Sequence, residues 1–260
     1  QEAMRYLKYE EFLKFQLTMQ YIKLSRKKNL GIKKQFDQQI IDKFINELPF
    51  ALTTDQKQAV NEIIEDLKSD TTMYRFVQGD VGSGKTVVGA IGLYANYLAG
   101  FQGALMAPTE ILATQHFTSL QKLFKDTNIN LTLLTGHLSN KEKQIIYQQL
   151  SDGKIDIVIG THALFQEKVN YYKLGLVITD EQHRFGVNQR KALKEKGQQV
   201  DFMVMSATPI PRTLAISLYG DMDVSTIKTM PKGRKPIISD VVRSHSMKPI
   251  LNKLKAYLAS

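Results

Sequence analysis

Eight consecutive residues of the chain have the types and the spacing of a loop that binds phosphate. Residues 79–86 read Gly-Asp-Val-Gly-Ser-Gly-Lys-Thr and match the pattern G-x-x-x-x-G-K-[ST] without a mismatch. Glycines let backbone N–H groups curl around a phosphate that a Cβ would obstruct. The Lys85 ammonium can reach the β- and γ-phosphates, and the Thr86 hydroxyl can hold the Mg²⁺ between them. We therefore expect a nucleoside triphosphate to bind with Mg²⁺ at Gly79, Asp80, Val81, Gly82, Ser83, Gly84, Lys85 and Thr86.

Two adjacent carboxylates end an apolar segment farther along the chain. Residues 174–179 read Leu-Gly-Leu-Val-Ile-Thr, and Asp180 and Glu181 follow them. In a phosphate-loop fold, the first acid at such a strand end approaches the Mg²⁺ and the second accepts a proton from the attacking water. Consecutive strand residues point to opposite faces, so the two carboxylates need not compete for one role. The pattern predicts ATP hydrolysis, with Asp180 at the metal and Glu181 as general base.

Gln56 has two interpretations that the residues alone leave open. Thr53 with Gln56 three residues later fits a capping box at the start of a helix. A side-chain amide can also donate and accept hydrogen bonds at the edge of an adenine ring.

Short apolar segments alternate with helical patterns from about residue 50 to residue 219. This alternation predicts an α/β fold, in which a mostly parallel sheet is flanked by helices. Ligands of such sheets bind at the carboxyl ends of the strands, where the candidate residues fall. The predicted strands are 74–78, 103–107, 131–135, 155–160, 174–180 and 202–206.

Two helices are expected before this domain and a linker after it. Residues 4 to about 24 carry apolar side chains at helical spacing, and residues 36–48 form a second apolar stripe that ends at Pro49. We expect these stripes to pack on the domain that follows or on parts outside this chain. Residues 221–260 contain Pro231, Gly233 and Pro236 in a basic stretch, which is typical of a linker.

The chain has 260 residues, no cysteine and a formal net charge of +10. The charge favours a polyanionic partner such as nucleic acid, although each basic cluster also fits a solvated surface. The absence of cysteine excludes disulfides and Cys-ligated metal sites, and together with the lack of a signal peptide or spanning segment it leads us to expect a cytoplasmic protein. The clusters are Lys23, Arg26, Lys27, Lys28, Lys33 and Lys34, then Lys228, Lys232, Arg234, Lys235 and Arg243.

Further motifs resemble the helicases and translocases of superfamily 2. Residues 180–183, Asp-Glu-Gln-His, resemble the D-E-x-H box, and residues 205–209, Met-Ser-Ala-Thr-Pro, resemble the S-A-T motif of that group. The runs that continue these motifs are similar to those of the RecG family of branched-DNA translocases, as are the segments 48–56 and 233–237. The resemblance spans essentially the whole chain.

This resemblance implies the first RecA-like lobe of a double-stranded DNA translocase. Residues 1–49 would be a helical connector, residues 50–230 the ATP-binding lobe, and residues 231–260 a linker and the start of a second lobe. The resemblance implies that Gln56 reads adenine and that Lys85, Asp180, Glu181 and His183 are catalytic, with Thr86 and Asp180 at the metal. His183, Ser206 and Thr208 would couple the γ-phosphate site to DNA.

DNA contacts are expected at three strand-to-helix junctions, where backbone N–H groups can meet phosphates. The same small polar residues can serve as helix caps, and the resemblance favours DNA. Binding is then expected to be sequence-independent and sensitive to salt, on forks and Holliday junctions, by a monomer. The residues are Pro108 and Thr109, Thr135 and Gly136, and Thr161 and His162.

RecG-like proteins also carry a wedge domain and a second lobe with arginine fingers, for which 260 residues leave no room. We therefore expect this chain to bind Mg-ATP weakly and to hydrolyse it hardly at all. A nucleotide-gated DNA-binding module and the motor lobe of a transcription–repair coupling translocase remain alternatives. His183 and the segment 233–237 favour the RecG family over the latter. The run after the S-A-T motif argues against a third alternative, an RNA helicase.

Overall fold

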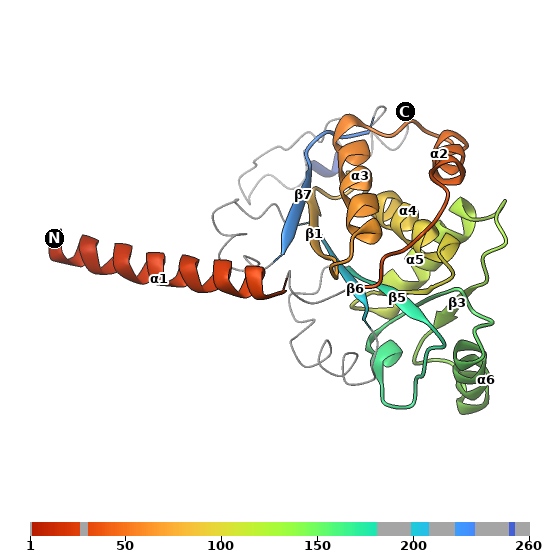
Figure 1. Cartoon of the computed structure of the whole chain (residues 1–260). Helices are drawn as coiled ribbons and strands as arrows, with labels where there is room; N and C mark the ends of the chain where they lie inside the picture. Colours follow the sequence, from red (N-terminus) through yellow and green to blue (C-terminus); the bar gives the residue numbers. More distant parts are fainter. Residues whose placement is uncertain (1, 27–30, 181–198, 208–221, 232–249, 253–260) are drawn as a thin grey trace.

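The computed structural model describes residues 2–26, 31–180, 199–207, 222–231 and 250–252. In this part of the chain, seven strands form one parallel sheet in the order β3-β4-β2-β5-β6-β1-β7 (Figure 1). The predicted α/β fold is confirmed. The strands are β1 Tyr74–Gly79, β2 Gln102–Met106, β3 Leu131–Leu134, β4 Ile157–Gly160, β5 Leu174–Asp180, β6 Asp201–Ser206 and β7 Asp223–Ile227. The helices are α1 Glu2–Arg26, α2 Gln38–Asn46, α3 Thr54–Lys68, α4 Lys85–Leu98, α5 Glu110–Leu123, α6 Asn140–Ser151 and the 3₁₀ helix η1 His162–Phe165.

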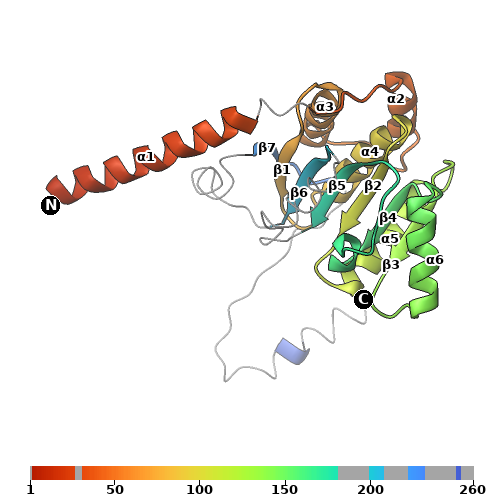
Figure 2. The ribbon, with the colours of Figure 1, turned by 60° about the horizontal axis from the view of Figure 1, so that its bottom comes forward.

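Both faces of the sheet are buried, because successive strand residues belong to different cores. In β2, Leu105 packs in the core that contains residues of α2, α3, α4 and α5. Its neighbours Ala104 and Met106 pack in a second core with Leu150 of α6 and Leu164 of η1. The helices therefore lie on both sides of the strands (Figure 2), as the near-continuous apolar segments predict.

β7 was not predicted: residues 223–227 lie in the stretch from residue 221 onward that was read as a linker, although the expected lobe boundary at residue 230 includes them. This strand pairs with β1 at one edge of the sheet. Its burial pattern is inverted at two positions, because Ser225 is 2% exposed whereas Val224 is 38% exposed. The buried hydroxyl is satisfied because Arg75 Nη1 donates to Ser225 Oγ at 2.9 Å. Hydrophobic alternation cannot predict a strand whose polar residue points inward.

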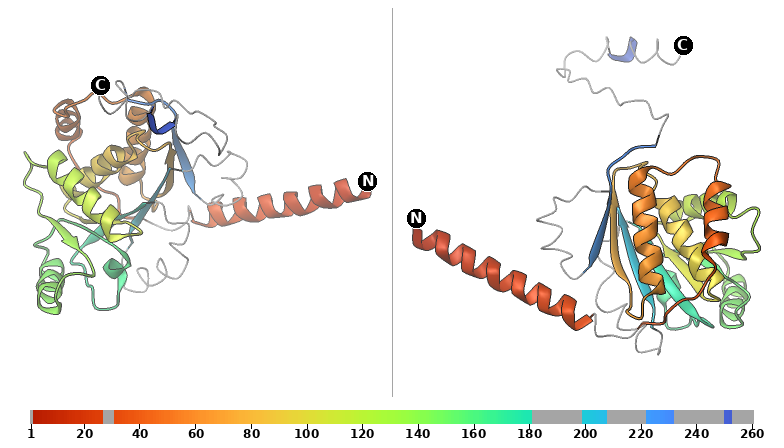
Figure 3. Two further views of the ribbon diagram at one scale, coloured as in Figure 1. Left: turned by 180° about the vertical axis from the view of Figure 1, so that it is seen from behind. Right: turned by 45° about the horizontal axis from the view of Figure 1, so that its top comes forward.

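The two expected N-terminal helices are present, and they differ in what they contact. α2 packs on the domain, with the ring of Phe44 4.4 Å from that of Tyr94 and 5.8 Å from that of Phe124. α1 extends away from the sheet (Figure 3), and its side chains Tyr6, Phe12 and others are exposed. Within the described residues, no helix is both long and apolar enough to span a membrane.

Lys34, which the sequence grouped with a basic surface cluster, is instead buried. Lys34 is only 2% exposed. Its ammonium contacts the Asp201 carboxylate and donates a hydrogen bond to the carbonyl oxygen of Gly175 at 2.8 Å. Asp201 also accepts the Met73 N–H at 2.7 Å. Burial lowers the pKa of Lys34 and raises the pKa of Asp201, because each loses the hydration of its charged form. The pair attaches the segment before α2 to the amino ends of β5 and β6.

Lys34→Met is expected to lower the free energy of unfolding by about 3–5 kcal/mol, because it leaves the buried Asp201 charge without its partner. Urea unfolding measures the loss, and Lys33→Met, at an exposed neighbour, is the control. The double variant Lys34→Met/Asp201→Asn should lose less than Lys34→Met alone. Equal stabilities of Lys34→Met and Lys33→Met would contradict this role.

Candidate functional site

The predicted phosphate loop connects the carboxyl end of β1 to the first turn of α4. Gly82 and Gly84 have φ angles of 80° and 89°, in the left-handed region that favours glycine. At Gly84 a Cβ would also collide with Gln56 Nε2. The first N–H groups of α4 have no partner within the helix, and its positive end faces the loop. This arrangement fits the phosphates of a nucleotide.

The Lys85 side chain is folded over the loop. Its Nζ donates to Gly79 O at 2.6 Å and to Asp80 O at 3.0 Å. Ser83, within the loop, is fully buried, and a Cβ on Gly79 would lie 2.6 Å from its hydroxyl. The ammonium is therefore positioned at the loop by backbone carbonyls, close to where phosphate oxygens would be bound.

Gln56 forms the predicted capping box and also contacts the loop. Its Oε1 accepts the Thr53 N–H at 2.8 Å, and Thr53 Oγ1 accepts the Gln56 N–H at 3.3 Å. Its Nε2 donates to Ser83 O at 2.6 Å, a contact that the sequence did not indicate. The capping interpretation is thus confirmed, and adenine recognition stays a prediction. The two are compatible, because a side-chain amide carries two N–H groups.

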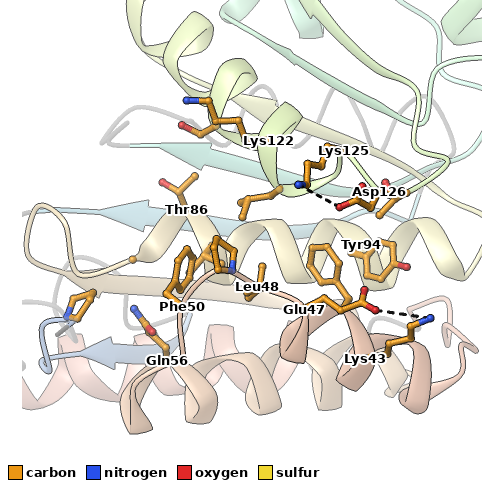
Figure 4. A pocket seen from close by; sticks show the side chains of 18 of the residues that line it. Lys43, Glu47, Leu48, Phe50, Gln56, Thr86, Tyr94, Lys122, Lys125 and Asp126 are labelled. Atoms are coloured by element: carbon orange, nitrogen blue, oxygen red, sulfur yellow. Dashed lines mark ion pairs between the residues drawn. The ribbon is translucent and has the colours of Figure 1, made fainter. Parts of the chain in front are cut away.

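A cavity of about 1010 Å³ opens beside the loop (Figure 4). Phe50, Gln56 and Thr86 lie toward one end of it, and Tyr94 lies toward the other. Phe50 is 45% exposed, and sequence reasoning did not select it. The sequence feature that could have identified Phe50 is an aromatic residue directly after Pro49 that belongs to neither helical stripe. An exposed ring at this position can stack on a nucleobase.

Two of the predicted metal-site and coupling residues, Asp180 and Ser206, lie near the carboxyl ends of adjacent strands. Asp180 is the last residue of β5 and pairs with Met205 of β6, while Ser206 pairs with Gln78 of β1. Gly79 and the phosphate loop follow directly. The fold therefore brings Asp180 and Ser206 to the edge of the sheet that carries the loop. The predicted residues Glu181, His183 and Thr208 lie outside the described residues.

Asp180 has a partner that the sequence did not reveal, His116 on α5. His116 Nε2 lies 2.6 Å from Asp180 Oδ2. The sequence feature that could have identified His116 is a histidine on the buried face of α5, between Ala113 and Leu120. In the ranges described, no cluster of three or more metal-binding side chains exists. A cation here would depend on Asp180, Thr86 and phosphate oxygens, as Mg²⁺ commonly does.

The predicted DNA-contacting residues follow three further strands at this edge of the sheet. Pro108 and Thr109 come after β2, Thr135 and Gly136 after β3, and Thr161 and His162 after β4. Because β3, β4 and β2 are adjacent and parallel, all three junctions lie at one half of the carboxyl edge. The predicted nucleotide residues lie at the other half, at the carboxyl ends of β5, β6 and β1, with β7 beside β1 at the margin of the sheet.

Hydrogen bonds within the protein already involve two of these junctions. Thr109 Oγ1 accepts the Leu112 N–H at 3.3 Å, so it caps α5. The Gly136 N–H donates to Glu110 Oε1 at 2.5 Å, and Glu110 Oε2 lies 2.7 Å from His137 Nε2. A DNA phosphate would therefore have to displace Glu110 to use the Gly136 N–H.

Comparisons with known proteins agree with this architecture. The sequence model of the DEAD/DEAH box helicase family matches residues 53–216. The chain is 51% identical over 257 residues to the ATP-dependent DNA helicase RecG of Staphylococcus aureus strain Mu50, covering 98% of this chain and 37% of that protein. It is 49% identical over 255 residues to RecG of Streptococcus pneumoniae serotype 4, covering 98% and 38%.

A solved structure is similar over nearly the whole chain. The structure of RecG bound to a three-way DNA junction superposes with a TM-score of 0.84 and 46% identity, covering 95% of this chain and 33% of that one. The chain thus spans little more than a third of the length of the curated relatives that it matches.

Proposed function

The chain belongs to the DEAD/DEAH box helicase family, and from this we propose that it is the ATP-binding motor lobe of a branched-DNA translocase of the RecG type. The observation that carries the proposal is the division of one sheet edge. Predicted nucleotide residues follow β5, β6 and β1, and predicted DNA residues follow β3, β4 and β2. Two ligands bound to one rigid edge can influence each other through the sheet and helices that they share.

In this proposal, ATP is held mainly by the phosphate loop. Lys85 neutralises phosphate charge, while Gln56 and Phe50 bind the adenine ring by hydrogen bonding and stacking. Thr86 and Asp180 hold Mg²⁺, directly or through its water shell. When bound, the cation neutralises the charge that develops on the β- and γ-phosphate oxygens. Glu181 takes the proton of the attacking water.

Coupling between the two halves is assigned to residues at their boundary. Ser206 lies at the end of β6 beside Gln78, one residue before the loop begins. Together with Thr208 and His183, Ser206 would contact the γ-phosphate, so that its presence or absence alters the position of the DNA-contacting residues. The alternative function, a nucleotide-gated DNA-binding module, would use the same geometry without hydrolysing ATP.

DNA binding is proposed to rest on phosphate contacts, which position the protein without reading sequence. The net charge of +10 supports this, and the similarity to a RecG bound to a three-way junction supports branched DNA as the substrate.

The test is fluorescence anisotropy with a labelled three-way junction, a linear DNA duplex and an RNA duplex of matched length. We expect the junction to bind most tightly and the logarithm of its affinity to fall linearly with the logarithm of salt concentration. Tightest binding of the RNA duplex would favour an RNA helicase. Binding of the junction that is unaffected between 50 and 200 mM salt, roughly the range over which phosphate contacts weaken, would contradict the proposal.

A further inference from the structure

The hydrogen bond between His116 and Asp180 joins the two halves of the carboxyl edge. His116 lies on α5, about two helical turns after the N-cap Thr109 at a predicted DNA junction. Asp180 ends β5, at the nucleotide half. The 2.6 Å contact therefore connects the helix that begins beside the predicted DNA surface to the predicted metal carboxylate.

The direction of this hydrogen bond follows from the chemistry of the two groups. An ionised carboxylate only accepts, so His116 Nε2 carries the proton and donates it to Asp180 Oδ2. The two side chains are 10% and 13% exposed, which shields the bond from competing water. The terminal torsion of an aspartate is broad, so a single well-placed donor strongly restricts its carboxylate plane.

Helix packing alone does not account for a histidine at this position. The flanking residues of the buried face of α5, Ala113 and Leu120, are apolar and fully buried. An apolar side chain would pack there without a desolvation penalty, whereas a buried imidazole needs a hydrogen-bond partner. Among the described residues, Asp180 is the partner that His116 finds, and His116 is the partner that Asp180 finds.

We propose that His116 is a positioning residue of the nucleotide site: by holding Asp180 Oδ2, it orients the carboxylate so that Oδ1 is presented to the divalent cation or its water shell. This inference rests on the proposed function, because it takes Asp180 as the carboxylate of the metal site. Carboxylate ligands of metals are commonly oriented by such hydrogen bonds, and loss of the partner typically weakens metal affinity 10–100-fold.

The experiment measures binding of a fluorescent non-hydrolysable ATP analogue in excess Mg²⁺ and in EDTA. The quantity compared between variants is the gain in affinity on adding Mg²⁺. His116→Leu, which removes the donor but fills the site, is expected to reduce this gain roughly 10–100-fold and to leave the affinity in EDTA unchanged. His116→Gln, whose amide N–H can take the place of Nε2–H, should recover most of the gain.

Thr118→Ala is the matched control, because Thr118 lies on the same helix and is exposed. Thermal unfolding establishes that each variant is folded, and His116→Phe replaces His116→Leu if leucine prevents folding. An unchanged gain in the donor-less variant would overturn the inference, and so would equal losses of affinity with and without Mg²⁺. A wild-type chain that gains nothing from Mg²⁺ would instead contradict the proposed function itself.

Discussion

Lys85→Ala is expected to weaken binding of ATP roughly 10- to 150-fold and to leave binding of adenosine unchanged. The Lys85 ammonium lies at the phosphate loop, where it donates to the carbonyls of Gly79 and Asp80. In the proposed complex it donates to phosphate oxygens, and hydrogen bonds to charged groups are each worth about 1.5–3 kcal/mol. With about 1.4 kcal/mol per tenfold change in affinity, one such bond gives the expected range.

Isothermal titration calorimetry with ATP and with adenosine separates a phosphate effect from a general one. Lys154→Ala is the control, because Lys154 is an exposed lysine that pairs with Asp152. It lies just before β4, and so near the amino ends of the strands, away from the loop. A parallel loss of adenosine binding would mean that the substitution collapses the cavity beside Phe50. Full retention of ATP affinity would contradict the assignment of the loop.

The parts of the fold and site that were predicted from sequence are those encoded by neighbouring residues. Six strands were placed to within two residues, because each is a short apolar run between helical patterns. The loop between β1 and α4 was predicted because its pattern spans eight consecutive residues. The capping box of Gln56 was found for the same reason, since its partner Thr53 is three residues away.

The parts that were missed depend on residues far apart in the chain. β7 pairs with β1, and its inward Ser225 accepts a hydrogen bond from Arg75, 150 residues earlier. The buried Lys34 ammonium donates hydrogen bonds to Asp201 and to the carbonyl of Gly175, which lie more than 100 residues later in the chain. No pattern within either segment records these contacts, so composition placed both on the surface or in a linker.

The same distinction applies to the site. His116 and Asp180 meet only after α5 has packed on the sheet, because the two residues are 64 positions apart in the chain. Glu110 reaches Gly136 only because β2 and β3 end at the same edge. A motif search finds residues whose neighbours in the sequence complete a pattern, whereas contacts between distant residues become visible only when the strands are in order.

The 260-residue chain is expected to hydrolyse ATP about 10³–10⁵ times more slowly than a full-length relative in the presence of forked DNA. The resemblance to RecG implies that arginine fingers reside in a second lobe, and such fingers contribute that much in related phosphoryl-transfer systems. The chain covers 37% of the Staphylococcus aureus relative. In the described part of the chain, the arginine nearest in sequence to the loop, Arg75, is paired with Glu62 and Asp66.

Steady-state Mg-ATPase assays of this chain and of full-length Staphylococcus aureus RecG, each with and without forked DNA, measure the difference. Lys85→Ala in this chain is the control, because any slow turnover that survives it comes from a contaminating enzyme. Turnover equal to that of the relative would place every catalytic group within these 260 residues and would contradict the divided site. Slow, Lys85-dependent turnover would instead mean that the sheet edge binds and orients ATP, while the groups that stabilise the transition state approach from the other side.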